Sequence, residues 1–379
     1  MKINKMKTKY TLVLALFAVS FFSFGQELAL VKEGKKAGYI NNSGEVVIPI
    51  QFEDAENFSD GIAAAEKDDM WGFINSSGEW AIQPEYEKVK DFNSGIAVVL
   101  KDDNWHYIDK SGAKVETPVS DKYYDFNDGV AFYRANDLVG LIGTNGKVLL
   151  EPTYDKIAKF RNGHAKVKKN DLWGMIDNTG KLVIPVEYTG IGNELTPAGV
   201  DAYKEESYGI VSNGTFNIIE GADKVWGFNG ESKLTYARKD KKLGFVNSKG
   251  EWVIQPAYEK VKAFAGGLAP VANGKMWGYI NESGEMVIEA AYRDAEIFKE
   301  GMAAVKDKKW GFIDKTGKLI IPMEYDITAG LSFSGSKVKG FKYGLARVKS
   351  KNGWGFLDKT GKLLADKWFE NAEPFVSVK

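Results

Sequence analysis

A period of about 34 residues runs through most of this chain and restricts the folds open to it. Positions that align with Trp71-Gly72 follow one another at spacings of 34, 34, 34, 34, 35, 35, 34, 33 and 44 residues. They are Ala37, Trp71, Trp105, Val139, Trp173, Tyr208, Leu243, Trp277, Trp310 and Trp354. Self-similarity at a fixed period is the signature of repeat architectures. The sequence therefore predicts ten repeats, with one insertion before the last.

The first half of each repeat predicts two strands joined by a hairpin turn. The first strand carries Trp-Gly and is aromatic and β-branched, as in Trp310 to Ile313. It runs into Asx-x-x-Gly, where the Asx side chain can bond the backbone two residues on and Gly supplies a positive φ. The second strand has three apolar central positions, as in Leu182 to Ile184. This pattern predicts a strand that is covered on both faces.

The second half of each repeat is marked by proline, two aromatic positions and Gly-x-Ala. Proline ends the second strand because it cannot donate to a sheet, and Pro84 is an example. Tyr86 follows, Phe92 comes six residues later, and Gly95 then opens the third strand. One such unit cannot bury its own apolar faces, so neighbouring units must stack.

These motifs recur together in register, as in WGFINSSGEWAIQPEY (71–86) and WGMIDNTGKLVIPVEY (173–188). On them the chain resembles the WG-repeat (KWG-type) family of bacterial proteins over nearly all of residues 27–379. The resemblance implies a β-rich repeat architecture. It implies no particular activity, because the functions of the family are largely unknown. Residues 189–242 depart from the pattern as a degenerate repeat region, and an insertion lies at 326–340.

The repeat length favours an open, curved or superhelical array of three-stranded β-meanders. A four-stranded propeller blade takes roughly 40 to 45 residues, and rings usually hold about 4 to 8 blades. A closed, propeller-like ring is the alternative, and one feature favours it. Leu28 to Val31 are in phase with the third strand of a repeat, and Phe375 lies where another third strand would begin. A strand that completes the last unit closes a ring, but the same phase would also suit a cap.

The first 25 residues predict a secretory signal peptide. Lysines at positions 2, 5, 7 and 9 precede an apolar run from Thr11 to Phe22, which is shorter than the roughly 20 residues that span a bilayer. Ser23 and Gly25 then supply small residues before Gln26. An uncleaved anchor is the alternative. We expect an exported protein, periplasmic or extracellular, with no transmembrane segment after cleavage. The expected regions are 1–25 (signal peptide), 26–188 (repeats 1–5), 189–242 (degenerate) and 243–379 (repeats 7–10).

Composition argues against several kinds of chemistry. The chain has no cysteine, which excludes disulfides, thiol nucleophiles and lipidation. His106 and His164 are its two histidines, too few for most histidine-based metal sites or catalytic triads. The 51 cationic and 51 anionic residues balance, and loss of four leader lysines leaves 47 against 51. Charge therefore gives no case for nucleic acid. We expect no cofactor and no metal.

Four residues are candidate ligand contacts, with local repacking as the alternative: Trp226, Trp105, His106 and Trp368. Trp226 lies out of register, His106 replaces the Gly of Trp-Gly, and Trp368 lies beside an aromatic position. The tryptophans of Trp-Gly are predicted to be inter-repeat core. Trp80 and Trp252 align with aliphatic residues and are predicted to be core as well.

Asp and Asn interchange in the hairpin turns, as at Asn75 and Asp177, which favours turn bonding over a catalytic carboxylate pair. We therefore predict a non-enzymatic protein that binds or scaffolds a protein partner in the cell envelope. The alternative is a carbohydrate or cell-wall binding module, and a hydrolase with dispersed carboxylates is a third hypothesis. Because insertions in repeat proteins often form the binding face, 189–208 and 326–340 are predicted specificity segments.

Overall fold

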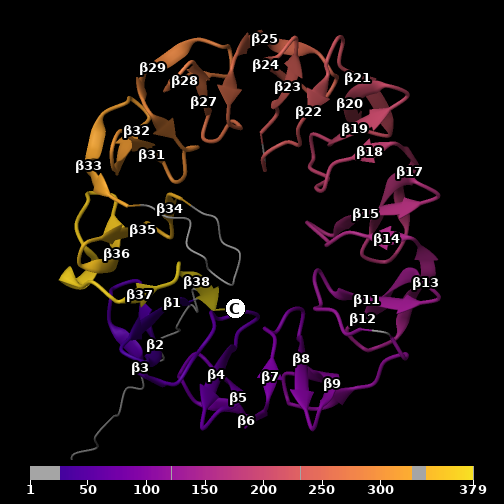
Figure 1. Ribbon diagram of the computed structural model, residues 1–379, viewed down its shortest axis with the longest axis vertical. Helices are drawn as coiled ribbons and strands as arrows, with labels where there is room; N and C mark the ends of the chain where they lie inside the picture. Colours follow the sequence, from indigo (N-terminus) through magenta and orange to yellow (C-terminus); the bar gives the residue numbers. More distant parts are fainter. Residues whose placement is uncertain (1–25, 121, 231, 327–338, 379) are drawn as a thin grey trace, which may run out of the picture.

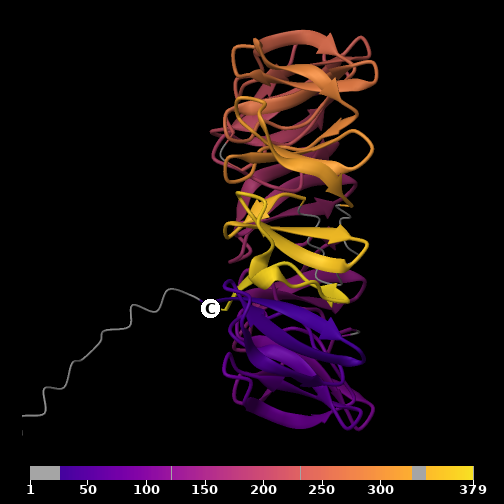
Figure 2. The same ribbon diagram turned by 90° about the vertical axis from the view of Figure 1, so that its left-hand side faces the viewer.

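The chain forms a closed ring of ten antiparallel sheets, each of which is one blade of a β-propeller (Figure 1). The structure, a computed structural model, describes residues 26–120, 122–230, 232–326 and 339–378. Edge-on, the ring is a flat disc one blade thick (Figure 2). Helix in the described residues is confined to one 3-10 turn, η1 (Leu364–Asp366).

The blades are numbered along the chain. They are blade 1 (β1–β3 with β37 and β38), blade 2 (β4–β6), blade 3 (β7–β10), blade 4 (β11–β13), blade 5 (β14–β17), blade 6 (β18–β21), blade 7 (β22–β25), blade 8 (β26–β29), blade 9 (β30–β33) and blade 10 (β34–β36). In the four-stranded blades the chain runs from a short inner strand to an outer strand at the rim, which is clearest from β22 to β25 (Figure 1).

Most inner strands lie between the two aromatic positions of a repeat, outside the three strands that the sequence predicts. They are β7 (Lys88–Val89), β14 (Lys156–Ile157), β18 (Gly190–Ile191), β22 (Lys224–Val225), β26 (Lys260–Val261), β30 (Asp294–Ala295), β34 (Phe341–Lys342), β37 (Asn371–Ala372) and β38 (Val376–Val378). The second strands begin near Gly-x-Ala: β1 (Gln26–Glu33), β4 (Ala63–Lys67), β8 (Ile96–Lys101), β11 (Val130–Ala135), β15 (His164–Lys169), β19 (Val200–Lys204), β23 (Thr235–Lys239), β27 (Leu268–Asn273), β31 (Met302–Lys306) and β35 (Leu345–Ser350).

The third strands carry the Trp-Gly position: β2 (Lys36–Asn41), β5 (Met70–Ile74), β9 (Asn104–Asp109), β12 (Leu138–Gly143), β16 (Leu172–Asp177), β20 (Ser207–Ser212), β24 (Lys242–Val246), β28 (Met276–Asn281), β32 (Trp310–Asp314) and β36 (Gly353–Asp358). The outer strands are β3 (Val46–Phe52), β6 (Trp80–Tyr86), β10 (Lys114–Val115), β13 (Val148–Tyr154), β17 (Leu182–Tyr188), β21 (Thr215–Ile218), β25 (Trp252–Tyr258), β29 (Met286–Tyr292) and β33 (Leu319–Tyr325).

Blade 1 closes the ring, so the open array favoured by repeat length is wrong and the ring alternative is confirmed. β1 pairs with β37 through Val31 and Ala372 and with β38 through Leu28 and Val376. Figures 1 and 2 show these first and last strands side by side. Closure covers the apolar end faces that an open array would leave exposed. A blade needs few residues here because most inner strands have only two.

The core lies between blades rather than within them. In blade 8, Trp277 and Tyr279 pack toward blade 9, where they meet Phe298. Ile280, on the opposite face of the same strand, packs with Phe245 of blade 7. The prediction that Trp-Gly tryptophans are inter-repeat core is confirmed for Trp277, Trp310 and Trp354, which are buried, whereas Trp71 and Trp173 are half-buried and Trp105 is 38% exposed. Each blade covers its apolar faces with two neighbours.

The outer strands are half-exposed, so the prediction that they are covered on both faces is wrong. In β29, Met286 is 42% exposed, whereas Ile288 is buried. The hairpin turn of the next blade explains the difference in exposure. Gly317 of that turn packs on Ile288, and Met286 at the start of the strand stays exposed to solvent. Trp80 and Trp252 occupy that open position and are half-buried rather than core.

The hairpin turns that begin with an Asx residue are of two chemical kinds. Asn75 Oδ1 accepts the backbone N–H groups two and four residues on, and its amide donates to the Glu79 carboxylate. Asp177 accepts the same two N–H groups and also the Thr179 hydroxyl, which lowers the pKa of Asp177. The predicted turn role of the Asx residues is therefore confirmed.

The degenerate region at 189–242 keeps the repeating architecture. It forms most of blade 6 and the first strands of blade 7, with β19 and β20 paired over five residues of each strand. The predicted specificity segment 189–208 is therefore part of a blade. Residues 327–338 of the other predicted segment, 326–340, lie outside the described residues, as does the predicted signal peptide at 1–25.

Candidate functional site

Blades 2 and 3 come from repeats of equal length but differ at the outer rim. Twenty-one residues separate Trp71 from Phe92, and the same number separates Trp105 from Phe126. Nevertheless β6 has seven residues and β10 has two. After β10 the described chain continues as an irregular link to blade 4 (Figure 1). Blade 3 has therefore lost most of its outer strand without losing any residues.

Two substitutions remove the anchors of that strand. Ile82 and Tyr86 of β6 are buried against blade 3. Their equivalents one repeat later are Glu116 and Ser120. A carboxylate is costly to bury and a serine is too small to replace a phenol, so the segment cannot pack as β6 does.

A third substitution places a side chain where the backbone of a regular outer strand would pass. A Cβ on Gly72 would lie 2.6 Å from the carbonyl oxygen of Ile82, because the outer strand passes directly over this glycine. In blade 3 the same position is His106, whose Nδ1 lies 3.2 Å from the carbonyl oxygen of Asn104. His106 therefore excludes a strand from the course that β6 takes.

A cavity of about 550 Å³ lies beside Trp105, where the regular outer strand is missing. Its walls include Lys90, Trp105, Ser120, Lys122 and Tyr123. The volume is in the range of sites that hold small ligands. The Trp105 side is open, because this residue is 38% exposed, against 5% for the equivalent Trp310.

In the described part of the chain, the indole of Trp105, like that of Trp71, lacks the cation that lies over the rings of Trp173, Trp277, Trp310 and Trp354. In blade 8, Lys262 Nζ lies 5.3 Å from the centre of the Trp277 ring. Lys90 aligns with Lys262, but its Nζ pairs with Asp125 at 2.9 Å. Within the described ranges no cation stacks on Trp105. The ring is therefore available to a ligand.

The far wall of the cavity is held in place by Tyr107. Its hydroxyl donates to the carbonyl oxygen of Tyr124 at 2.7 Å and accepts the Tyr124 N–H at 3.0 Å. Burial raises the pKa of Tyr107, so the hydroxyl stays protonated. Tyr123 packs edge-on against the same ring at 5.0 Å. The wall is thus preformed.

The cavity carries both signs of charge. Lys122 Nζ lies 5.5 Å from the Tyr124 ring, and no described carboxylate is within 4 Å of it. The negative charge is that of Asp103, which lines the cavity on the side of Trp105. The backbone N–H of Asp103 donates a hydrogen bond to the Glu87 carboxylate. An acidic ligand group would therefore approach from the side of Lys122.

The other two predicted contacts lie in different blades. Trp226 stacks on Tyr236 with ring centres 4.9 Å apart. The Trp368 ring covers Gly355 of blade 10, within 2.8 Å of a Cβ placed there. Both pack against their own blade, and of the four predicted residues only Trp105 lines the cavity, with His106 beside it.

Sequence reasoning missed Ser120, Lys122 and Tyr123. Their signal was present in the repeat alignment, because blades 2 and 3 align without gaps from the Trp-Gly position to the phenylalanine. A polar residue at each of two buried positions, Glu116 and Ser120, marks the break in the pattern.

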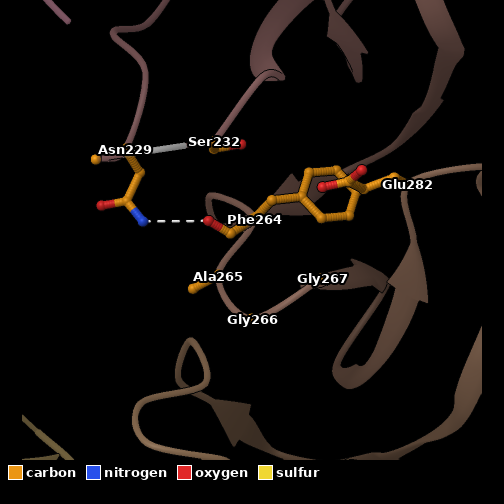
Figure 3. A pocket seen from close by; sticks show the side chains of 8 residues that line it. Asn229, Ser232, Phe264, Ala265, Gly266, Gly267 and Glu282 are labelled. Atoms are coloured by element: carbon orange, nitrogen blue, oxygen red, sulfur yellow. Dashed lines mark hydrogen bonds between the residues drawn. The ribbon is translucent and has the colours of Figure 1, made fainter. Parts of the chain in front are cut away.

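A second hollow of about 350 Å³ lies between blades 7 and 8 (Figure 3). The side-chain amide of Asn229 donates a hydrogen bond to the carbonyl oxygen of Phe264 at 3.1 Å and so bridges the two blades. Gly266 and Gly267 form part of its wall. This hollow offers a ligand few side-chain groups.

No cluster of three or more His, Asp or Glu residues that could hold a metal ion occurs in the described ranges. No helix within those ranges is long and apolar enough to cross a membrane.

Several solved structures are similar to this chain at TM-scores below 0.5. One is described as a eukaryotic initiation factor, with 14% identity over 78% of this chain and 95% of that one, and a TM-score of 0.46. Another is PorZ of Porphyromonas gingivalis, described as a bacterial surface component of the type-IX secretion system, with 12% identity, 83% and 51% coverage, and a TM-score of 0.25. A third, YCF48 bound to D1 peptide, has 8% identity, 66% and 88% coverage, and a TM-score of 0.24. No match was found among curated protein sequences.

The sequence profile described as WG containing repeat matches nine segments of the chain. They are 38–71, 71–105, 107–138, 140–173, 173–194, 244–276, 277–309, 310–331 and 354–377. Together they cover more than half of the sequence, and the longest unmatched stretch among them falls in the degenerate region. The chain therefore belongs to the WG-repeat family, whose repeats here form the blades of a ten-bladed ring.

Proposed function

We propose that this protein is a non-enzymatic scaffold that binds a protein partner at the cavity of blade 3. The observation that carries the proposal is the loss of an outer strand from a repeat of full length, which leaves Trp105 exposed beside a cavity. Aromatic anchors in preformed pockets dominate the energetics of many protein interfaces. Blade 3 combines both features.

The proposed place of action is the cell envelope or the exterior. The basic head and apolar run of residues 1–25 support export. A fusion of residues 1–30 to a reporter that folds only after export tests this step. An active reporter is expected, and an inactive reporter retained with its leader would remove the envelope from the proposal.

Site-specific photo-cross-linking tests the proposed site in the native cell. A photoreactive phenylalanine replaces Lys122 at the cavity, and the matched control replaces Lys88, the aligned residue at the regular seam between blades 2 and 3. Irradiation is expected to join one partner protein, identified by mass spectrometry, to position 122 and not to position 88. Identical adducts at both positions, or none at 122, would contradict a binding site in blade 3.

A cell-wall glycan is the alternative occupant of the same cavity. The exposed indole of Trp105 offers an apolar face, and Asp103 and Ser120 offer polar groups for sugar hydroxyls. Soluble cell-wall fragments distinguish the two occupants. If they abolish the adduct at position 122 in isolated envelopes, the glycan alternative is favoured.

A further inference from the structure

We propose that the cavity beside Trp105 receives an aromatic side chain from an extended partner segment, with an acidic residue directly before that aromatic. The inference rests on the proposed protein-binding function and specifies the chemistry of the partner. The basis of the inference is a contact between adjacent blades. The propeller makes this contact with its own residues at other blade interfaces, or seams, and it is missing at the seam between blades 3 and 4.

The seam between blades 2 and 3 shows the contact complete. Tyr86, at the end of β6, is 2% exposed. Glu85, directly before it, pairs with Lys101 Nζ at 2.8 Å. The same Nζ lies 5.8 Å from the centre of the Tyr86 ring. One lysine therefore holds both members of a Glu-Tyr pair.

The seam between blades 5 and 6 repeats this arrangement. Glu187 pairs with Lys204 Nζ at 3.1 Å, and that Nζ lies 5.7 Å from the Tyr188 ring. Blades 2 and 5 differ in most of their surface residues, but their outer strands end in the same Glu-Tyr pair. The contact is thus a recurring way to fill the end of an inter-blade seam.

At the seam between blades 3 and 4 all three members of the contact are replaced, with Val119 for Glu85, Ser120 for Tyr86 and Ala135 for Lys101. The residue that aligns with Tyr86 is Ser120, whose hydroxyl accepts the backbone N–H of Arg134 at 3.2 Å. Ser120 lines the 550 Å³ cavity, so a larger side chain at this position has space beside it. That volume accommodates an aromatic side chain together with flanking backbone.

The cavity also supplies a cation for an acidic neighbour. Lys122 lies on its wall, and no described carboxylate is within ion-pair distance of its Nζ. Lys90 is already paired with Asp125. Asp103 repels an acid from the opposite side. These charges favour an acidic–aromatic segment whose carboxylate approaches Lys122.

His106 decides how the segment binds. Its Cβ occupies the place where the backbone of a regular outer strand would pass, as the clash predicted for Gly72 shows. A partner backbone therefore cannot take the course of β6. Recognition is by insertion of a side chain between Trp105 and Tyr123 and not by addition of a strand to β9.

The chain itself supplies a probe, the capped synthetic peptide of residues 82–88 (IQPEYEK). Protein labelled with 5-fluorotryptophan reports on Trp105 by fluorine NMR, and Trp105→Phe assigns the resonance. Saturable movement of this resonance is expected. The peptide with Tyr changed to Ala should bind at least tenfold more weakly.

Two substitutions at one position form the matched controls. Ser120→Tyr fills the cavity from within and is expected to weaken peptide binding at least tenfold. Ser120→Thr leaves the space open and should bind as the wild type does. Lys122→Glu gives a second route if the tyrosine variant does not fold. It should lose the IQPEYEK peptide and recover binding to IQPKYEK, in which the charge is reversed.

An unmoved Trp105 resonance, or equal affinity for the Tyr and Ala peptides, would overturn the inference. If that happens while the cross-linker at position 122 still captures a partner protein, the proposed function stands and only the acidic–aromatic chemistry fails. If cell-wall fragments move the resonance and the peptide does not, both proposals fail together.

Discussion

Blades 2 and 3 are adjacent and built on repeats of equal length, yet only blade 2 has a full outer strand. Their second and third strands pair over comparable lengths, so the two inner layers of each blade form independently of the rim. The outer strand is therefore held by an aliphatic anchor, an aromatic anchor and a glycine over which it passes. Where these three residues are replaced, as in blade 3, a cavity takes the place of the packed interface between outer strand and neighbouring blade.

The outer strand can be lost because only one of its faces meets a neighbouring blade. Each third strand still packs against blades on both sides, so the ring stays closed without a complete rim. Blade 10 makes the same point, since its described sheet ends at β36 and Trp368 covers Gly355 in place of a strand. A site at the rim therefore costs the ring little stability.

Gly72→His, which gives blade 2 the residue of blade 3, should be the most damaging single change. The new Cβ would lie 2.6 Å from a carbonyl oxygen of β6, and relief requires that the strand detach. We expect about 5 kcal/mol loss in the free energy of unfolding, measured by urea denaturation. The reverse change, His106→Gly, should cost less than about 1 kcal/mol, because Glu116 and Ser120 still prevent strand formation. A well-tolerated Gly72→His would refute the role given to the glycine.

Truncating equivalent tryptophans should separate a packed seam from the open one. Trp310 is 5% exposed with Lys306 and Lys339 on its ring, so Trp310→Ala should cost about 4 kcal/mol. Trp105→Ala should cost about 1 kcal/mol, because much of its ring already faces the cavity. Thermal unfolding of both variants checks the ranking, and equal losses would mean that Trp105 is a core residue.

Tyr86→Ser should give blade 2 a cavity like that of blade 3. Removal of a buried phenol is expected to cost about 3 kcal/mol. Ser120→Tyr should change the unfolding free energy by less than about 1 kcal/mol, because the new ring fills existing space. Urea unfolding measures both. A large loss in the second variant would show that the cavity cannot accept an aromatic ring.

The smallest expected effect concerns the hairpin turns of the two blades. Blade 2 uses Asn75 and blade 3 uses Asp109, whose pKa is lowered by the Ser111 hydroxyl and two backbone N–H groups. The folded-state pKa of Asp109 is therefore below the unfolded value of about 3.9. Its contribution to stability is present above that pH and is lost as pH falls through the folded pKa. Asp109→Asn should remove this part of the acid sensitivity, measured as the urea midpoint from pH 6 to pH 3, and an unchanged slope would contradict the turn's role.

The sequence predicted the features that most repeats share. Local spacing and alternation of residue types determine the repeat period, the turn at Asn75 and the burial of Trp277. These patterns can be read from the sequence directly. Closure of the ring was harder to predict from the sequence. The position of Leu28 to Val31 within the repeat suits a terminal cap as well as the sheet of blade 1, which these residues join. No local pattern decides whether the curvature of ten blades brings the ends together.

Exposure at the rim was mispredicted for a different reason. Three apolar residues in a row, such as those beginning at Leu182, look like a strand covered on both sides, but one face of an outer strand meets only solvent. Near the cavity of blade 3, the sequence singled out only Trp105 and His106 as candidates. Ser120 and Lys122 became visible once the structure showed which positions of a repeat anchor the rim.

Hydrogen–deuterium exchange in blades 2 and 3 measures whether blade 3 lacks the protection of an outer strand and binds a ligand there. In the free protein, amides of the segment at Trp105 and His106 should exchange faster than those at Trp71 and Gly72, which lie under β6. Addition of the IQPEYEK peptide should slow exchange in the 122–124 wall and at Trp105, and leave blade 2 unchanged. Equal protection of the two segments in the free protein, with no change on adding the peptide, would contradict both the missing strand and the site that its absence creates.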